Sequence, residues 1–186
     1  MARLVQERGD AVRRLGEVFR QHGYEGASLA LITAGTGLGK GSLYNFFPGG
    51  KEEMATAVLE DIDRWFAEAI FQPLRQDADP AAAVAAMLDG VAAYFDGGGR
   101  VCLVGVFALG EVRDRFAERV QGYFAAWTAS LAAALTRGGR PPEIAGDLAE
   151  EAVLAIQGAL VLARAMDDRG VFARALDRLR TRLAPM

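Results

Sequence analysis

The segment Ser28–Lys51 constrains the fold of this 186-residue chain more than any other part. It reads SLALITAGTGLGKGSLYNFFPGGK and predicts two short helices joined by a glycine-rich turn. Ser28 is placed as an N-cap, because its hydroxyl group can accept a hydrogen bond from a backbone N–H of the first turn. Gly35 and Gly37 favour a tight turn, since glycine adopts positive φ angles without steric cost. A second helix over Lys40–Phe47 is then stopped by the Pro-Gly-Gly that follows it.

Two short helices joined in this way are typical of the helix-turn-helix unit, whose second helix enters the major groove of DNA. The segment resembles the signature of the TetR family of transcriptional regulators. The resemblance is carried by Ile32 and by the runs Gly23–Ser28, Gly37–Phe47 and Lys51–Met54. It implies an α-helical body for ligand binding and dimerisation. A weaker likeness to the branch of lincomycin- and flavonoid-responsive repressors lies in the runs Phe47–Glu53, Gly98–Gly105 and Gly158–Ala165.

Two glycines depart from the family pattern. Gly39 stands where an N-cap side chain is common, and Gly35 replaces a longer residue late in the first helix. Each lowers helix propensity by about 1 kcal/mol relative to alanine. We therefore expect the helix-turn-helix to be mobile before it meets DNA.

Apolar residues recur at helical spacing along the whole chain, and no strand-like alternation of any length occurs. Hydrophobic residues make up 52% of the sequence, with alanine and leucine dominant, as in a globular helical protein. We expect an all-α protein of about nine helices. The expected division is a DNA-binding domain in residues 1–53, with its helix-turn-helix at about 28–47, and a ligand-binding and dimerisation domain in residues 54–186.

Several features favour a cytoplasmic protein. The single cysteine, Cys102, excludes an internal disulfide and fits a reducing compartment. The N-terminal residues lack the apolar core of a signal peptide. The longest apolar runs, at about 101–110 and 152–163, are too short to span a membrane and indicate buried helices.

Charge is distributed unevenly along the chain. Residues 1–51 carry seven Lys and Arg against four Asp and Glu, a net +3, whereas residues 52–186 carry 14 against 20, a net −6. A basic head on an acidic body is expected when only the head faces phosphate. The only two lysines, Lys40 and Lys51, fall in the helix-turn-helix segment. Chance in an arginine-rich sequence is the alternative explanation of their position.

The sequence argues against an enzyme. A phosphate-binding loop needs Gly, four residues and then Gly-Lys-Ser/Thr, but Ala34 stands at the first position and Gly41 follows Lys40. One histidine and one cysteine leave no metal-ligand spacing. No nucleophile with a matching base can be identified. We expect no catalytic residues, no metal and no cofactor.

By the resemblance, seven residues contact operator DNA: Ser28, Lys40, Gly41, Ser42, Tyr44, Asn45 and Lys51. Tyr44 and Lys51 are expected on phosphates, where positive charge supplies affinity that is independent of sequence. Lys40, Ser42 and Asn45 are expected on base edges, because lysine can donate to guanine and asparagine can pair with adenine. A packed aromatic ring is the alternative for Tyr44, and a solvated polar side chain is the alternative for Asn45.

The body is rich in aromatic residues, most of which belong to its core at helical spacing. A cavity between helices lined by some of them would suit a flat apolar or aromatic ligand. The candidate lining residues are Trp65, Phe66, Met87, Tyr94, Phe107, Tyr123, Trp127 and Gln157. Gln157 interrupts a long apolar run, so it either orients a ligand or bonds a neighbouring helix.

The last two predicted helices, at about 142–166 and 171–183, are the expected dimer face. Close packing of the first helix is favoured by its small Ala155 and Gly158 and by its apolar residues Leu154, Ile156, Ala159, Leu160 and Leu162. The second helix offers Phe172, Leu176, Leu179 and Leu183. By the resemblance, two copies form a four-helix interface and bind a near-palindromic operator. The predicted function is a homodimeric repressor that a small apolar or aromatic ligand releases from DNA. An activator, or a helical small-molecule-binding or scaffold protein with a vestigial head, is the alternative.

Overall fold

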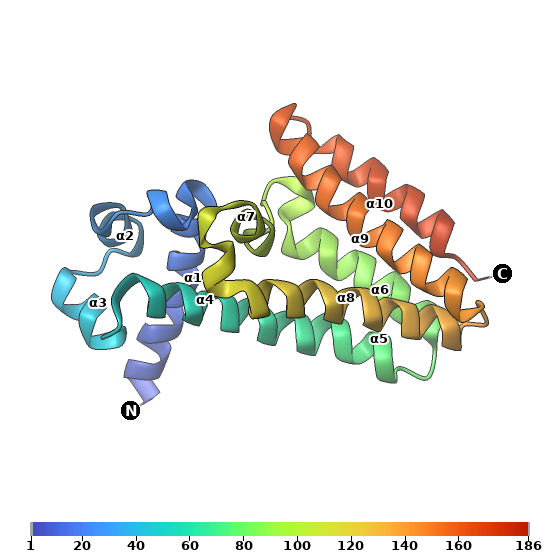
Figure 1. The fold of residues 1–186 in the computed structure, drawn as a ribbon, viewed down its shortest axis with the longest axis horizontal. Helices are drawn as coiled ribbons and strands as arrows, with labels where there is room; N and C mark the ends of the chain where they lie inside the picture. The colour runs from blue at the N-terminus through green and yellow to red at the C-terminus, as the bar shows by residue number, and fades with distance from the viewer. Residues whose placement is uncertain (1, 186) are drawn as a thin grey trace. The chain divides into compact units, whose positions relative to one another are not determined.

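The computed structural model describes the backbone of residues 2–185 and the side chains of residues 7–185. Every regular element in this range is helical (Figure 1). The segments α4 (Gly50–Phe66), η1 (Ala67–Phe71) and α5 (Gln72–Gln76) run on without a break, so the described chain has nine α-helical stretches. The prediction of an all-α protein of about nine helices is confirmed. No helix among the described residues has both the length and the apolar character needed to cross a membrane.

The contacts divide the chain into two compact units. The head unit consists of Met1–Arg64 together with Leu103–Val120, and the body unit consists of Trp65–Cys102 together with Gln121–Met186. The segment 103–120 therefore packs with the N-terminal helices, although it lies far from them in the sequence. A division of roles between residues 1–53 and 54–186 remains a prediction.

The head unit is built on α1 (Ala2–Gly26), which packs against α2 (Leu29–Thr36) and α7 (Leu103–Leu109). Its buried stripe of apolar side chains consists of Ala11, Val12, Leu15, Val18 and Phe19. Gly23 interrupts the helix with a φ angle of 66°. The helical pattern of this segment predicts Arg20 on the outer face with Arg13 and Arg14, and for Arg20 that prediction is wrong. Only 8% of Arg20 is exposed, because it folds back and pairs with Glu17 at 2.8 Å.

Close contact between α1 and α2 explains Gly35. A Cβ atom added at this position would lie 2.3 Å from Cγ2 of Val18, which is far inside van der Waals contact. Val18 is itself buried and, being β-branched, has little freedom to rotate away. Gly35 thus allows α1 and α2 to approach closely, and this packing requirement explains a residue of low helix propensity within α2.

Replacing Gly35 with alanine is expected to destabilise the protein by about 1–2 kcal/mol. Overpacking costs about 1–3 kcal/mol, and the gain of about 1 kcal/mol in helix propensity offsets only part of it. Gly41→Ala is the matched control, because a Cβ there meets nothing within 4 Å. Urea unfolding should show Gly41→Ala unchanged or stabilised. Equal stability of the two variants would contradict this explanation of Gly35.

The segment after residue 102 completes the core of the head unit. Phe107 of α7 lies 6.1 Å from the ring centroids of both Phe19 and Tyr24, and 5.5 Å from Phe116. Phe116 closes the 3-10 helix η3 (Glu111–Phe116). The prediction that α7 is buried all round is wrong at its end, since Leu109 is 87% exposed.

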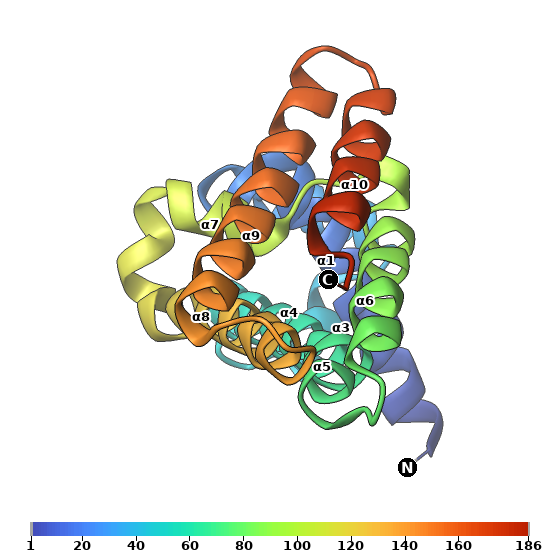
Figure 2. The ribbon, with the colours of Figure 1, turned by 90° about the vertical axis from the view of Figure 1, so that its right-hand side faces the viewer.

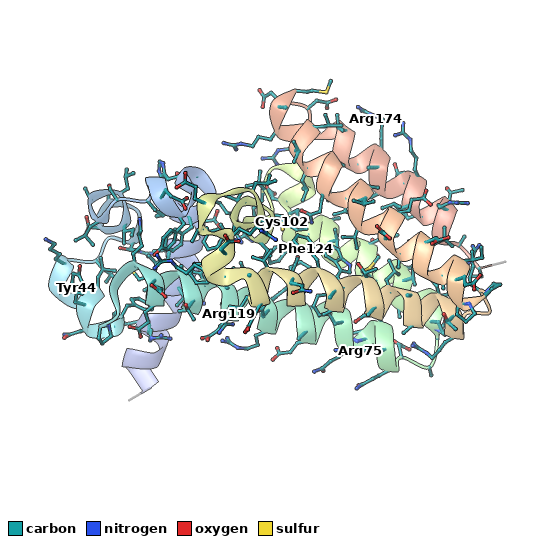
Figure 3. The ribbon with its side chains drawn as sticks, viewed as in Figure 1. Tyr44, Arg75, Cys102, Arg119, Phe124 and Arg174 are labelled. Carbon is teal, nitrogen blue, oxygen red and sulfur yellow. The ribbon has the colours of Figure 1, made fainter. Side chains whose placement is uncertain are left out.

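Ion pairs also tie this segment to α4. Arg115 pairs with Glu52 at 2.5 Å, and Arg119, labelled in Figure 3, pairs with Glu60 at 2.8 Å and Asp63 at 3.6 Å. Burial raises the pKa of the Asp63 carboxyl group, and the Arg119 guanidinium opposes that rise. The pairs are partly exposed, so each stabilises the structure only modestly.

The body unit contains α6 (Pro80–Tyr94), η2 (Asp96–Gly98), α9 (Pro142–Ala165), α10 (Gly170–Leu183) and most of α8 (Ala117–Arg137). Helices α9 and α10 lie side by side (Figures 1 and 2), and α10 also packs on α6 and η2. Asp79 caps α6, because its carboxylate accepts hydrogen bonds at 3.0 Å from the backbone N–H groups of Ala81 and Ala82.

A π-helical segment, η1, interrupts the long helix before Pro73. Proline has no N–H to donate to the carbonyl group of residue 69, and its ring crowds that carbonyl. The helix therefore widens over one turn before α5 continues it. On the neighbouring α6, Gly90 leaves space for Ile70, whose Cδ1 would lie 2.9 Å from a Cβ at that glycine.

Candidate nucleic-acid interface and aromatic cluster

The helix α2 and the turn after it are fixed by short-range hydrogen bonds. Ser28 is the N-cap, as predicted, and its Oγ accepts a hydrogen bond from the N–H of Leu31 at 3.3 Å. Gly37 ends the helix in the left-handed conformation with a φ angle of 70°. The buried Thr36 donates its hydroxyl proton to Ile32 O at 2.6 Å and accepts from the N–H of Leu38 at 3.3 Å. These bonds fix the conformation of the turn that leads into α3 (Lys40–Phe46).

The two faces of α3 differ sharply. Leu43 and the following Phe47 are fully buried and anchor the helix in the head unit. The exposed face carries the five predicted contacts Lys40, Gly41, Ser42, Tyr44 and Asn45. Tyr44, labelled in Figure 3, is 47% exposed. Among the described residues, the Lys40 side chain has no ion-pair or hydrogen-bond partner. This face can therefore donate to and accept from a nucleic acid without first breaking internal bonds.

Lys51, in the first turn of α4, is held more closely than the sequence suggests. Its Nζ lies 4.6 Å from the ring centroid of Tyr24 and donates to the carbonyl oxygen of Glu25 at 3.4 Å. The side chain is half-buried, so its ammonium group is already oriented. A cation over an aromatic face is attracted by the ring quadrupole.

Tyr24 is the residue that sequence reasoning missed at this site. Its ring packs on Phe19 and Phe116 and forms the face under Lys51. Burial raises the pKa of its phenol, with Arg115 opposing the rise, so the ring stays neutral at neutral pH. The only sign of this role in the sequence was that an aromatic residue, Tyr24, follows Gly23.

A carboxylate of the protein itself, that of Glu53, lies at the N-terminus of α4. The carboxylate of Glu53 accepts a hydrogen bond from the N–H of Gly49 at 2.7 Å. A phosphate expected at this helix end would compete with that carboxylate for the same N–H.

The structure brings six of the eight predicted ligand residues into one aromatic cluster in the body unit: Trp65, Phe66, Met87, Tyr94, Tyr123 and Trp127. The fully buried Phe66 is its centre, with centroid distances of 4.8 Å to Tyr94, 4.9 Å to Tyr123 and 5.3 Å to Trp127. The ring of Trp65 packs against that of Tyr94, with centroids 4.5 Å apart and planes inclined by 35°. The indole N–H of Trp127 points at the sulfur of Met87 at 3.5 Å.

The other two predicted ligand residues lie elsewhere. Phe107 belongs to the head unit, where it packs with Phe19, Tyr24 and Phe116. Gln157 lies on α9 in the body unit. Its Nε2 atom is buried without a hydrogen-bond partner among the described residues, which is a costly state for an amide.

One face of α9 is apolar and exposed. Of the eight large hydrophobic residues exposed in the described chain, five lie on or at the end of α9: Ile144, Leu154, Val161, Leu162 and Met166. Leu154 and Leu162 agree with the predicted dimer face. Ile156, Ala159 and Leu160 do not, because they are buried within the protomer. The expected apolar face of α10 is likewise internal, since Phe172, Leu176, Leu179 and Leu183 are all buried.

Two family models match the chain. Residues 16–58 match the model described as bacterial regulatory proteins, tetR family. Residues 80–178, more than half of the chain, match the C-terminal domain of LmrA/YxaF-like transcriptional regulators. The chain belongs to the TetR family. It is a transcriptional regulator with a DNA-binding head, and the family prediction is confirmed.

Known TetR-type proteins resemble it over nearly their full length. The HTH-type transcriptional regulator YxaF of Bacillus subtilis (strain 168) is 27% identical over 173 residues, which cover 89% of this chain and 91% of YxaF. A TetR family regulator from Agrobacterium tumefaciens has the same fold, with a TM-score of 0.80, 19% identity and coverage of 97% and 99%. CifR, a TetR family regulator solved with 26-bp double-strand operator DNA, gives a TM-score of 0.59, 26% identity and coverage of 93% and 89%.

Proposed function

We propose that this TetR-family protein is a homodimeric repressor whose two α3 helices read a near-palindromic operator. The observation that carries the proposal is the exposed polar face of α3 above the buried Leu43 and Phe47. Base edges would be read by Lys40, Ser42 and Asn45. Phosphates would be bound by Tyr44 and by Lys51, whose ammonium group Tyr24 orients. Ser28 would place the N-terminus of α2 on the DNA backbone, and Gly41 would admit close approach of α3.

The exposed apolar face of α9 supports the dimer. A pair of α9 helices could pack across Gly158, because a Cβ there would meet nothing within 4 Å and the backbone is open to a partner. A two-fold dimer presents two recognition helices about 34–36 Å apart, one turn of DNA. The relative CifR has been solved in complex with 26-bp double-strand operator DNA.

The aromatic cluster around Phe66 supports a small apolar or aromatic ligand. Its rings now pack on one another in edge-to-face and tilted pairs, so a flat ligand would enter by separating them and replacing these contacts. Binding of this kind favours a different arrangement of α4, α6 and α8. If that arrangement fits the operator less well, ligand and DNA oppose each other by the same coupling energy, typically about 1–3 kcal/mol.

The experiment is a fluorescence-anisotropy titration of the protein against a duplex that it selects from a randomised pool. Lys51→Ala should weaken binding to all duplexes alike and reduce the slope of log affinity against log salt by about 1. Asn45→Ala should instead cost about 1–3 kcal/mol at one base pair and relax the preference there. Adding a flavone to the wild-type complex should release the DNA.

Arg75→Ala is the control for loss of one positive charge, because Arg75 is an exposed cation of the body unit (Figure 3). It should leave affinity and salt slope unchanged. Identical behaviour of Lys51→Ala and Asn45→Ala across duplex variants would contradict the assigned roles. Selection of no sequence by the wild-type protein would contradict operator reading altogether.

A further inference from the structure

Two arginines of α1 reach across to the ends of the two DNA-reading helices. Arg14 donates from Nη1 to the carbonyl oxygen of Thr36, the last residue of α2, at 2.8 Å. Arg8 donates from Nε to the carbonyl oxygen of Phe46, the last residue of α3, at 3.4 Å. The Arg8 guanidinium also lies 4.9 Å from the ring centroid of Phe47.

These carbonyl groups are the ones that a helix leaves without internal partners. The last turn of an α-helix has four such oxygens and carries the negative end of the helix dipole. A guanidinium at this end satisfies an oxygen and complements the dipole. The Arg14 guanidinium also lies beside the turn, since a Cβ at Gly37 would lie 3.4 Å from its Nη1.

The two helices need external support of this kind. They contain eight and seven residues, well below the length at which isolated helices are stable in water. The N-cap of α3 is Gly39, which supplies no side-chain hydrogen bond. Leu43 and Phe47 are buried and anchor one side of α3, and the bond from Arg8 adds a contact at its C-terminal end.

We propose that Arg8 and Arg14 are positioning residues for operator reading, which hold the C-terminal ends of α3 and α2 on α1 before DNA binds. The inference rests on the proposed role of α3 in reading bases. It differs from a role in phosphate attraction, where only the charge would matter and any exposed arginine of α1 would serve equally.

Arg13 separates these two explanations. It is the neighbour of Arg14 in the sequence and carries the same charge, with 68% of its side chain exposed. Its ion pair is made to Asp10 within α1, so it holds neither α2 nor α3. Loss of Arg13 and loss of Arg14 therefore remove equal charge from adjacent positions, and only the latter removes a bond to the helix-turn-helix.

The test compares Arg14→Gln, Arg8→Gln and Arg13→Gln in the full-length protein, with the duplex selected by the wild type and a shuffled duplex as probes. Arg14→Gln and Arg8→Gln should weaken binding to the selected duplex roughly tenfold or more, since a misplaced base contact loses that much. All three variants should weaken binding to the shuffled duplex by the same small factor, about two- to threefold, with equal salt slopes. Arg14→Lys, which retains charge and one donor, should recover part of the selectivity.

Hydrogen exchange of the DNA-free protein gives a second readout that does not depend on an operator. Amides of α2 should exchange faster in Arg14→Gln, and amides of α3 faster in Arg8→Gln, whereas Arg13→Gln should match the wild type. Equal losses on both duplexes in all three variants, with unchanged exchange, would overturn the proposal. A different outcome is that the wild-type protein selects no duplex while Arg14→Gln and Arg8→Gln still exchange faster than it does. That outcome would place the failure in operator reading, and the positioning role would fall with it.

Discussion

Replacing Phe66 with alanine is expected to lower the free energy of unfolding by about 3–5 kcal/mol, the range for large aromatic residues removed from cores. Phe66 is fully buried at the end of α4 and has six aromatic neighbours. These are Trp65, Phe71, Tyr94, Phe95, Tyr123 and Trp127, all with ring centroids within 6.3 Å. The variant loses the transfer free energy of the ring and leaves a cavity that so many rigid neighbours fill poorly. Urea unfolding at fixed protein concentration, followed by circular dichroism, measures the change.

Phe124→Ala is the matched control for this prediction. Phe124, labelled in Figure 3, is only half-buried on α8 and contacts the ring of Tyr123 at 5.1 Å. The same chemical change should cost about 1–2 kcal/mol there, because less apolar area returns to water. A loss for Phe66→Ala no larger than that of Phe124→Ala would mean that the cluster rearranges around the gap. A cluster that rearranges so easily would also open readily for a ligand.

The sequence predicted the ends of the two short helices α2 and α3 because the signals for them are local. A capping serine, a left-handed glycine and a Pro-Gly-Gly stop act within a few residues of the helix ends that they define. The structure places Ser28 and Gly37 at the two ends of α2, whereas Gly35, which the sequence predicted in the turn, lies inside that helix. The exposed face of α3 follows from the same local pattern, since burial of Leu43 leaves its polar neighbours outward.

Features set by distant parts of the chain could not be predicted in this way. Gly35 looked like a loss of helix propensity, and only its distance to Val18 explains it as a packing requirement. Lys51 looked like an exposed cation, whereas Tyr24 holds it. Phe107 looked like a body residue from its place in the sequence, yet the fold assigns it to the head unit.

The dimer face shows the same limit within one helix. Apolar residues occur on every side of α9 between residues 152 and 163, so periodicity alone does not separate the internal face from the exposed one. The structure separates them: Ile156 and Leu160 point into the protomer, and Leu154 and Leu162 point away from it. Exposed leucines at this spacing form a stripe along one side of the helix.

Introducing charge into that stripe is expected to convert the proposed dimer to a monomer. Leu154 and Leu162 are 65% and 51% exposed, so Leu154→Glu with Leu162→Glu should leave the protomer folded. In a dimer the two carboxylates would instead be buried against a second apolar helix, at a cost of several kcal/mol for each unpaired charge. Light scattering after gel filtration should give the protomer mass of 19.9 kDa in place of twice that value.

Loss of the dimer should also abolish tight operator binding. Two linked heads bind two half-sites with an affinity about 10²–10⁴ times that of one head, and a monomer forfeits that gain. Ala125→Glu with Ala129→Glu, at exposed positions of α8, adds the same charge and should preserve both the dimer and the affinity. A dimeric Leu154→Glu, Leu162→Glu variant would place the interface elsewhere on the body. A monomeric variant with unchanged affinity would show that one α3 helix reads its half-site alone, and the near-palindromic operator would then have no structural basis.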